Sequence, residues 1–120
     1  MKEAIIIIRP NQYSATKTSL LAAGFSAMHS ENVLGHGKND VNYKLKQDKS
    51  DDNAIKIGDY TMITKKQITI VIRDQDVDKL VEAVMEVNST SNSGDGKIFI
   101  LPTEKVVRIR TKEIADNALV

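Results

Sequence analysis

A short glycine-rich segment followed by two spaced arginines is the part of the sequence best suited to binding an anion. Residues 94–97 read Gly-Asp-Gly-Lys, and glycines let backbone amides converge on an anion while the lysine adds a positive charge. Arg108 and Arg110 stand two residues apart, so on a strand both guanidinium groups would leave from one face and could each hold phosphate oxygens in pairs. The spacing predicts a polyphosphate site, and equally well a glycine turn followed by a solvated edge strand.

Other chemistries find less support in the sequence. The glycine segment is no Walker A loop, because the first glycine and the Ser/Thr after the lysine are missing. His29 and His36 have no ligand partner at helical or hairpin spacing, so we expect no metal site from them. Gly35-His36-Gly37 lacks the third glycine of a dinucleotide-binding fingerprint. No serine lies in a nucleophile elbow, and cysteine is absent. We therefore expect no catalytic residues.

Length and charge narrow the classes of function. The chain has 120 residues, 41% of them hydrophobic and 28% charged, as expected of one globular domain, residues 1–120. A formal net charge of +1 argues against binding DNA or RNA, which normally needs a basic surface. The longest apolar run, residues 4–8, is too short to cross a bilayer, and no signal-peptide pattern precedes it. We expect a cytoplasmic protein.

The elements that must position these residues follow from hydrophobic periodicity. Ile and Val together number 24, against 7 Leu, which favours a sheet. Apolar patterns predict strands at 3–9, 28–34, 67–72, 97–101 and 106–110, and helices at about 14–23, ending at Gly24, and from 77 to 87 with Asp74 or Asp76 as cap.

This order predicts an α+β, ferredoxin-like βαββαβ fold: an antiparallel sheet with two helices on one face and a short C-terminal strand. RNA-recognition domains share this order, but they stack bases on aromatic residues of the central strands, and residues 67–72 contain none. The strand at 3–9 is apolar on both faces, so we expect self-association to cover the face opposite the helices.

Residues 36–59 interrupt the pattern between the second and third strands. They include five Lys and five Asp with little hydrophobic periodicity. A long irregular segment in a small domain is normally a functional loop, although a tolerated surface insertion has the same composition. The segment begins at a Gly-His-Gly hinge, which favours a functional loop.

Several of these segments resemble one known family. Residues 94–100, Gly-Asp-Gly-Lys-Ile-Phe-Ile, followed by Pro102 and by Val-Arg-Ile-Arg-Thr at 107–111, are similar to the signature of the PII signal-transduction proteins. The opening Ile-Ile-Arg-Pro at 7–10, Gly-His-Gly-Lys at 35–38 and the helix from Asp74 through Val84 also resemble that family.

The resemblance implies a sensor, not an enzyme, that forms a homotrimer or a heteromer with a PII paralogue. Members of the family bind ATP or ADP in clefts between subunits, in many cases with magnesium and 2-oxoglutarate. The nucleotide-binding residues that it implies are His29, Gly35, Gly37, Lys38, Thr90, Gly94, Asp95, Gly96, Lys97, Arg108 and Arg110. Asn39 and Lys65 are implied to contact 2-oxoglutarate, with magnesium held through ATP and Asn39. The flexible target-binding loop would span about 37–59 and carry Tyr43, Lys44, Lys46 and Lys49.

Departures from the family pattern bear on ligand and target. Asn39 replaces a glutamine and Val41 a glycine, which leaves 2-oxoglutarate binding open. Ser91 replaces a glycine of the nucleotide loop. The target-binding loop at about 37–59 lacks the tyrosine that is uridylylated in enteric members.

The altered sequence of the target-binding loop, with Gly24-Phe25 before the second strand, resembles the nitrogen-fixation-linked subgroup. Members of that subgroup act in pairs to inhibit nitrogenase under nitrogen-replete conditions. The alternatives are a regulator of an ammonium transporter or of glutamine synthetase, and a slow ATPase or small-molecule enzyme on the same fold.

Overall fold

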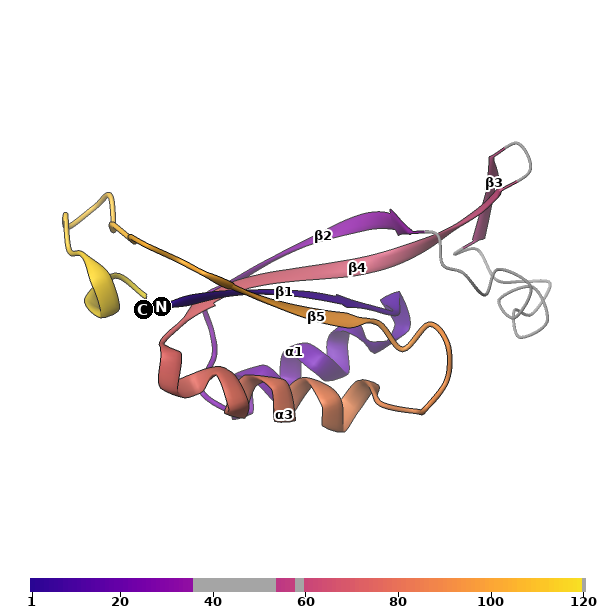
Figure 1. The fold of residues 1–120 in the computed structure, drawn as a ribbon, viewed down its shortest axis with the longest axis horizontal. Coiled ribbons are helices and arrows are strands. Elements are labelled where there is room, and N and C mark those ends of the chain that lie inside the picture. The colour runs from indigo at the N-terminus through magenta and orange to yellow at the C-terminus, as the bar shows by residue number, and fades with distance from the viewer. Residues whose placement is uncertain (36–53, 58–59, 120) are drawn as a thin grey trace.

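The computed structural model describes residues 1–35, 54–57 and 60–119, with the backbone alone at 54–57, 60 and 61. Four strands form one antiparallel sheet in the order β2-β4-β1-β5: β1 (Lys2–Ile8), β2 (Met28–Gly35), β4 (Tyr60–Ile72) and β5 (Lys97–Pro102). The helices α1 (Tyr13–Ala22) and α3 (Val77–Asn88) both cover one face of it (Figure 1). The predicted α+β, ferredoxin-like βαββαβ arrangement is confirmed.

The helix-covered face contains the hydrophobic core. Along β1, Ala4, Ile6 and Ile8 are buried, while the residues between them are only partly buried. Ile68, Ile70 and Ile72 of β4 join them, and Leu20 of α1 with Leu80 and Val84 of α3 close the core from the other side. β1 is therefore buried on one face only within a single chain.

The opposite face of the sheet, which we call the open face, keeps apolar side chains in contact with solvent. The pairing aligns Ile5 with Phe99 and Glu3 with Leu101, and Phe99 and Leu101 are 46% and 38% exposed. In the next row toward the glycine segment, Ile7 pairs with Lys97. The open face thus combines apolar surface with the cation of the predicted anion site, which fits the expectation that a second copy covers it.

Local chemistry explains the helix boundaries. α1 ends in a Schellman motif, in which Phe25 N donates to Leu20 O and Gly24 N to Leu21 O, with Gly24 at a φ of 97°.

The prediction that Asp74 or Asp76 caps the second helix is wrong, because no side-chain cap hydrogen bond forms at its start. Asp76 instead accepts from Arg73 Nε at 3.2 Å, and Asp74 pairs with the N-terminal amine at 2.9 Å, in the short 3-10 turn η2 (Asp74–Asp76).

Two predicted boundaries need correction between the second and third strands. The segment 36–59 is not wholly irregular, because residues 54–57 form a strand, β3 (Ala54–Ile57), that pairs with β4 from Ala54–Ile63 to Ile57–Tyr60. The strand expected at 67–72 begins at Tyr60 and extends well beyond its pairing with β1, which ends at Lys66. The single-sequence pattern missed β3 because it is short and pairs only with the adjoining part of β4, and it missed the start of β4 because residues 64–67, Thr-Lys-Lys-Gln, interrupt the apolar run although they pair with β2.

The fifth predicted strand, at 106–110, is wrong. This segment forms a compact turn, the C-terminal hairpin (residues 106–115), with only an isolated bridge between Val107 and Ile114. Arg108 N donates to Glu113 O at 2.8 Å, Lys112 N to Arg108 O at 2.7 Å and Ala115 N to Val106 O at 3.1 Å. Lys112 and Ala115 have positive φ values of 62° and 56°, which end any extended run. A short 3-10 helix, η3 (Ala115–Ala118), follows.

Candidate anion-binding site

The glycine loop, residues 89–96, joins the end of α3 to the start of β5. Gly94 and Gly96 have φ values of 94° and 116°, conformations that glycine adopts without strain. A Cβ at Gly96 would lie 1.9 Å from the carbonyl oxygen of Ile7, so no other residue fits against β1 there. Ser91 also has a positive φ, 62°, at the position where the resembling family carries a glycine.

The carboxylate of Asp95 organises this loop from inside. It accepts from Thr90 N at 2.7 Å and from Asn92 N at 3.4 Å, and it also bonds the Thr90 hydroxyl. Burial alone would raise the pKa of Asp95, but the hydrogen bonds from Thr90, Arg9 and Asn92 outweigh burial and hold the pKa well below its ordinary value. Asp95 is thus an ionised scaffold group whose oxygens face the protein.

Two cations hold the loop from neighbouring strands. Arg9, just after β1, donates from Nη1 to Asp95 Oδ1 at 2.7 Å and from Nη2 to Ser93 O at 2.9 Å. Lys65 of β4 donates from Nζ to Gly94 O at 2.7 Å and is only 8% exposed. Burial is the main cause that lowers the pKa of Lys65, and the nearby charge of Arg9 lowers it further. Arg9 and Lys65 thus outnumber the carboxylate of Asp95 by one positive charge, before Lys97 is counted.

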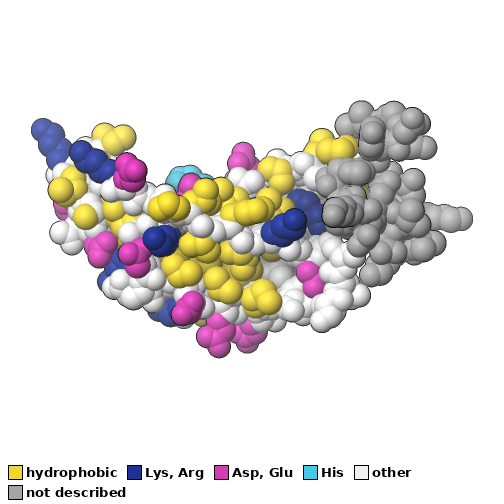
Figure 2. Space-filling model, viewed as in Figure 1, with side chains coloured by type: hydrophobic (Ala, Val, Ile, Leu, Met, Phe, Trp, Pro, Cys, Tyr) yellow, Lys and Arg dark blue, Asp and Glu magenta, His cyan; other side chains and the backbone are white. Residues whose placement is uncertain are grey.

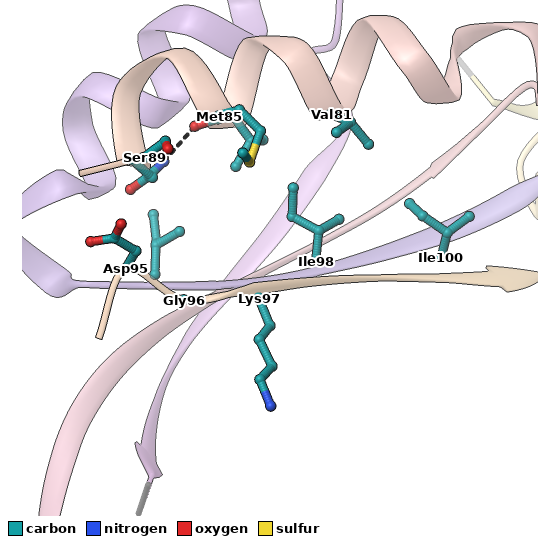
Figure 3. A pocket seen from close by; sticks show the side chains of 11 residues that line it. Val81, Met85, Ser89, Asp95, Gly96, Lys97, Ile98 and Ile100 are labelled. Carbon is teal, nitrogen blue, oxygen red and sulfur yellow. Dashed lines mark hydrogen bonds between the residues drawn. The ribbon is translucent and has the colours of Figure 1, made fainter. Parts of the chain in front are cut away.

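Lys97 directs its ammonium away from the helices. Figure 3 shows its side chain leaving β5 on the side opposite Ile98 and Ile100, which point toward α3. In the sheet it pairs with Ile7, which also pairs with Gln67, so Lys97 belongs to the open face. An anion held by Lys97 would therefore bind on the open face, beside the glycine loop.

The sequence-predicted residues fall into separate places in one chain. Gly35 lies beside Lys65, whose Cγ would be 3.7 Å from a Cβ at that position, and Lys65 in turn contacts the glycine loop at Gly94 O. His29 lies on β2 and pairs with Thr69 of β4, and both β4 and β1 lie between β2 and β5 in the sheet. His29 is exposed on the open face and does not meet the glycine loop of its own chain.

The two arginines are also remote from the glycine loop of their own chain, so one chain alone does not bring these predicted anion-binding residues together. Lys97 begins β5, whereas the arginines follow its end at Pro102, a strand length of about 20 Å. Figure 1 places the hairpin beside the two termini and the glycine loop at the other end of the sheet. Arg108 is bound within its hairpin, to Glu113 Oε2 at 3.2 Å and Asn117 O at 2.9 Å, while Arg110 is exposed.

Some predicted residues lie outside the described part of the chain, so the structure does not test them. These are His36, Gly37, Lys38, Asn39, Tyr43, Lys44, Lys46 and Lys49. Within the described residues, no cluster of three or more His, Cys, Asp or Glu side chains could hold a metal ion. Nor is any helix in that part of the chain both long and apolar enough to cross a membrane.

Sequence reasoning assigned no role to Arg9. The register of β1 with β5 runs from Lys2–Pro102 to Ile7–Lys97, and continued by two residues it sets Arg9 opposite Asp95. The sequence does contain a signal for this contact: a basic residue directly follows one strand, and an acidic residue precedes its antiparallel partner. The contact can be inferred from that signal only when the pairing of the two strands is known.

Comparison with known proteins identifies the family. The sequence model of the family described as nitrogen regulatory protein P-II matches residues 1–113. The chain belongs to the P-II family. The resemblance of the glycine loop and the Arg-Ile-Arg segment to PII proteins is thereby confirmed over almost the whole chain.

Individual relatives connect this PII protein with nitrogen fixation. It is 40% identical over 124 residues to the nitrogen fixation nifHD region GlnB-like protein 2 of Methanobacterium ivanovii, covering 99% of each chain. The protein of the same description from Methanococcus maripaludis is 39% identical over 121 residues, covering 99% of this chain and 100% of the relative. A nitrogen regulatory protein P-II of Pyropia yezoensis is 35% identical over 121 residues. These relatives support a nitrogen regulatory role for this PII protein and its nitrogen-fixation-linked subgroup.

Proposed function

We propose that this PII protein is a non-enzymatic sensor of nitrogen status that binds ATP or ADP between neighbouring copies of the chain. The separation of Lys97 from Arg108 and Arg110 along β5 is the observation that carries this proposal. Cations that share one polyphosphate must lie within a few ångströms of it. Because one chain holds its two cationic parts at opposite ends, a complete site requires the hairpin of a second copy.

A site built from opposite ends of one chain constrains the assembly. The loop end of one copy must meet the hairpin end of the next, which is a head-to-tail contact, and head-to-tail contacts close into rings when the rotation allows. The family resemblance supports a ring of three. The exposed Phe99 and Leu101 on the open face supply apolar surface that such a ring would remove from water.

The described residues fit the phosphates of a nucleotide. Gly94 and Gly96 have the backbone conformations that bring a chain close to an anion, and Lys97 supplies an ammonium on the open face. In this proposal Arg108 and Arg110 of the next copy hold phosphate oxygens from the other side, and magnesium accompanies the nucleotide. Lys65 and Asn39 are the residues that would contact 2-oxoglutarate.

The proposed output is the shape of the loop at about 37–59. Lys65 lies on the strand that continues into the β3–β4 pair and already contacts Gly94 O, so the glycine loop and the base of the target-binding loop share one side chain. A ligand changes such an equilibrium by the difference in its affinity for the two loop states. We propose nitrogenase as the target under nitrogen-replete conditions, supported by the nitrogen-fixation descriptions of the relatives.

Calorimetric titration with ATP, ADP and 2-oxoglutarate tests the ligand part of the proposal. We expect Lys97→Ala to weaken ATP binding by about 1.5–3 kcal/mol, the range for a hydrogen bond with a charged group. Glu104→Gln, an exposed change outside the site, is the matched control. Unchanged ATP binding by the lysine variant contradicts the phosphate site, and phosphate release from ATP contradicts a non-enzymatic sensor.

A pull-down from nitrogen-replete lysate, with and without ATP, tests the target. Recovery of nitrogenase is the expected result. Recovery of an ammonium transporter or of glutamine synthetase alone contradicts that choice but leaves the nucleotide site standing.

A further inference from the structure

An apolar cleft lies between α3 and the edge strand β5, on the helix-covered side of the sheet. It has a volume of about 360 Å³, and its walls come from Val81, Val84 and Met85 of α3 and from Ile98 and Ile100 of β5. Met85 and Ile100 are 50% and 36% exposed. Figure 2 shows hydrophobic side chains gathered across the middle of this side of the molecule, where α3 and β5 lie in Figure 1. Two helices thus leave the edge strand partly uncovered.

The inner end of this α3–β5 cleft is the back of the glycine loop. Asp95 and Gly96 line the cleft together with Asn88 and Ser89 at the end of α3. Lys97 also borders it, although its ammonium points to the other side of the sheet (Figure 3). Whatever fills the cleft therefore contacts the loop from the side opposite to the proposed phosphates.

A protruding apolar side chain lies at the far end of the same chain. Ile109, at the turn of the C-terminal hairpin, is 94% exposed, and the Lys112 N–Arg108 O bond of 2.7 Å closes that turn around it. Isolated exposed apolar residues are common. Ile109, however, lies between two arginines that the nucleotide proposal requires at a second copy.

The charges around the two surfaces are complementary. Glu82 and Glu86 are exposed on α3, next to the Val81 and Met85 that line the cleft. Lys112, also exposed, lies three residues after Ile109 in the hairpin. Opposite charges at the rim of an apolar contact favour one orientation and speed association.

We propose that Ile109 of one copy inserts into the α3–β5 cleft of the next copy. The inference rests on the proposed head-to-tail nucleotide site and specifies its contact. With Ile109 in the cleft, its neighbours Arg108 and Arg110 lie beside Asp95 and Gly96 at the cleft's inner end. Because β5 is the edge strand of the sheet, their long side chains can pass its outer edge to the open face, where Lys97 lies. The same insertion that joins two copies then supplies the missing guanidinium groups.

Engineered cysteines test the contact directly, since the natural chain has none. Ile109→Cys and Met85→Cys are made in separate chains, which are co-refolded and oxidised, and disulfide-linked dimers are counted on a non-reducing gel. A disulfide needs Cα atoms within about 7 Å, so only residues in contact link efficiently. Random mixing in a head-to-tail ring brings the two cysteines together at about a quarter of the contacts, so we expect disulfide-linked dimers to approach about half of the chains. Leu21→Cys on α1, 48% exposed against 50% for Met85, replaces Met85→Cys in the matched control and should link several-fold less.

Association of unlinked chains gives a second measurement. Burial of an isoleucine is worth enough that Ile109→Ser should weaken self-association roughly tenfold or more in sedimentation experiments, whereas Ile109→Leu should not. Because Ile109 is almost fully exposed within its own chain, neither change should affect folding, which circular dichroism checks.

The outcomes separate this inference from the proposed function. Two outcomes overturn the cleft contact alone. One is that Ile109→Cys links equally well to Met85→Cys and to Leu21→Cys, and the other is that Ile109→Ser associates as the natural chain does while still forming rings and binding ATP. A natural chain that stays monomeric with saturating ATP overturns both the ring and the contact. Strong, selective linking of the Ile109 and Met85 positions supports the contact.

Discussion

Arg9 Nη1 and Asp95 Oδ1 lie 2.7 Å apart although 86 residues separate them in the sequence. The pair joins the end of β1 to the loop before β5, and both side chains are largely shielded, with exposures of 28% and 20%. Since Arg9 also binds Ser93 O, it fixes two points of the glycine loop. The loop is therefore organised without its ligand, which lowers the ordering entropy that binding would otherwise require.

Asp95→Asn should destabilise the fold and change its dependence on pH. The amide keeps the shape but loses the charge that Arg9 and Thr90 bind, so we expect a loss of about 1–3 kcal/mol at pH 7. A carboxyl whose pKa is lowered by folding stabilises the protein above its ordinary pKa of about 4, and that stability is lost as the pH falls below it. Urea unfolding of both proteins between pH 7 and pH 3 measures this, and the difference should shrink toward acid. A difference that stays constant between pH 7 and pH 3 would show that the charge of Asp95 does not stabilise the fold.

Gly96→Ala should be one of the most damaging small changes in the protein. The new Cβ would lie 1.9 Å from Ile7 O at a backbone φ of 116°, and strain with overpacking should cost at least about 2 kcal/mol. Gly35→Ala is the matched control, because the nearest atom to its Cβ would be 3.7 Å away. Thermal unfolding compares the two, and equal melting temperatures would refute the close approach of β5 to β1.

Lys65→Met should loosen the glycine loop while leaving the core intact. The change removes the 2.7 Å hydrogen bond to Gly94 O but keeps most of the buried alkyl chain. Amide hydrogen exchange at Gly94 and Gly96 should become about fivefold faster, corresponding to roughly 1 kcal/mol of local stability. Exchange at Ile6 in the core should not change. If exchange in the loop is unaffected, Lys65 does not restrain it.

A shared nucleotide site predicts complementation between two inactive variants. Lys97→Ala and Arg108→Ala each remove one part of the site, but in a mixed ring some interfaces join an intact glycine loop to an intact hairpin. Random co-refolding should restore ATP binding at about a quarter of the sites. Calorimetry measures the fraction of ATP sites restored in the mixture. The controls are each single variant refolded alone and the double variant refolded with each single variant, none of which should recover ATP binding. No recovery in rings of verified mixed composition would place the whole site within one chain.

The core of the fold could be predicted from the sequence because its pattern is strong. Alternate residues of β1 (Ile6 and Ile8) and of β4 (Ile68, Ile70 and Ile72), together with the apolar positions of α3, face one core, so their element types follow from hydrophobic patterns. β3 was missed because Ala54–Ile57 is short and pairs outside the core. The strand at 106–110 was wrong because Val107 and Ile109 imitate strand residues, while Arg108 turns the chain back onto Glu113.

The candidate site was predictable in its residues and less so in its geometry. Residue types identified Gly94, Gly96 and Lys97, and the family resemblance added Lys65. That Lys65 contacts Gly94 O, and that Asp95 faces inward toward Thr90, depends on pairing across distant strands. Single-sequence patterns carry no information about such long-range register.

β4 is a single strand that passes from the core, past Lys65, to Tyr60. Beyond Lys66, its last residue paired with β1, β4 remains paired with β2 as far as Ile63. Only the segment from Met62 to Tyr60, paired with β3, extends past the four-stranded part of the sheet, and three residues span about 10 Å. In the proposed function, a tilt of roughly 15° at Ile63 would move Tyr60 by about 3 Å, so a small adjustment of β4 around a bound phosphate would reach the target-binding loop as a larger displacement.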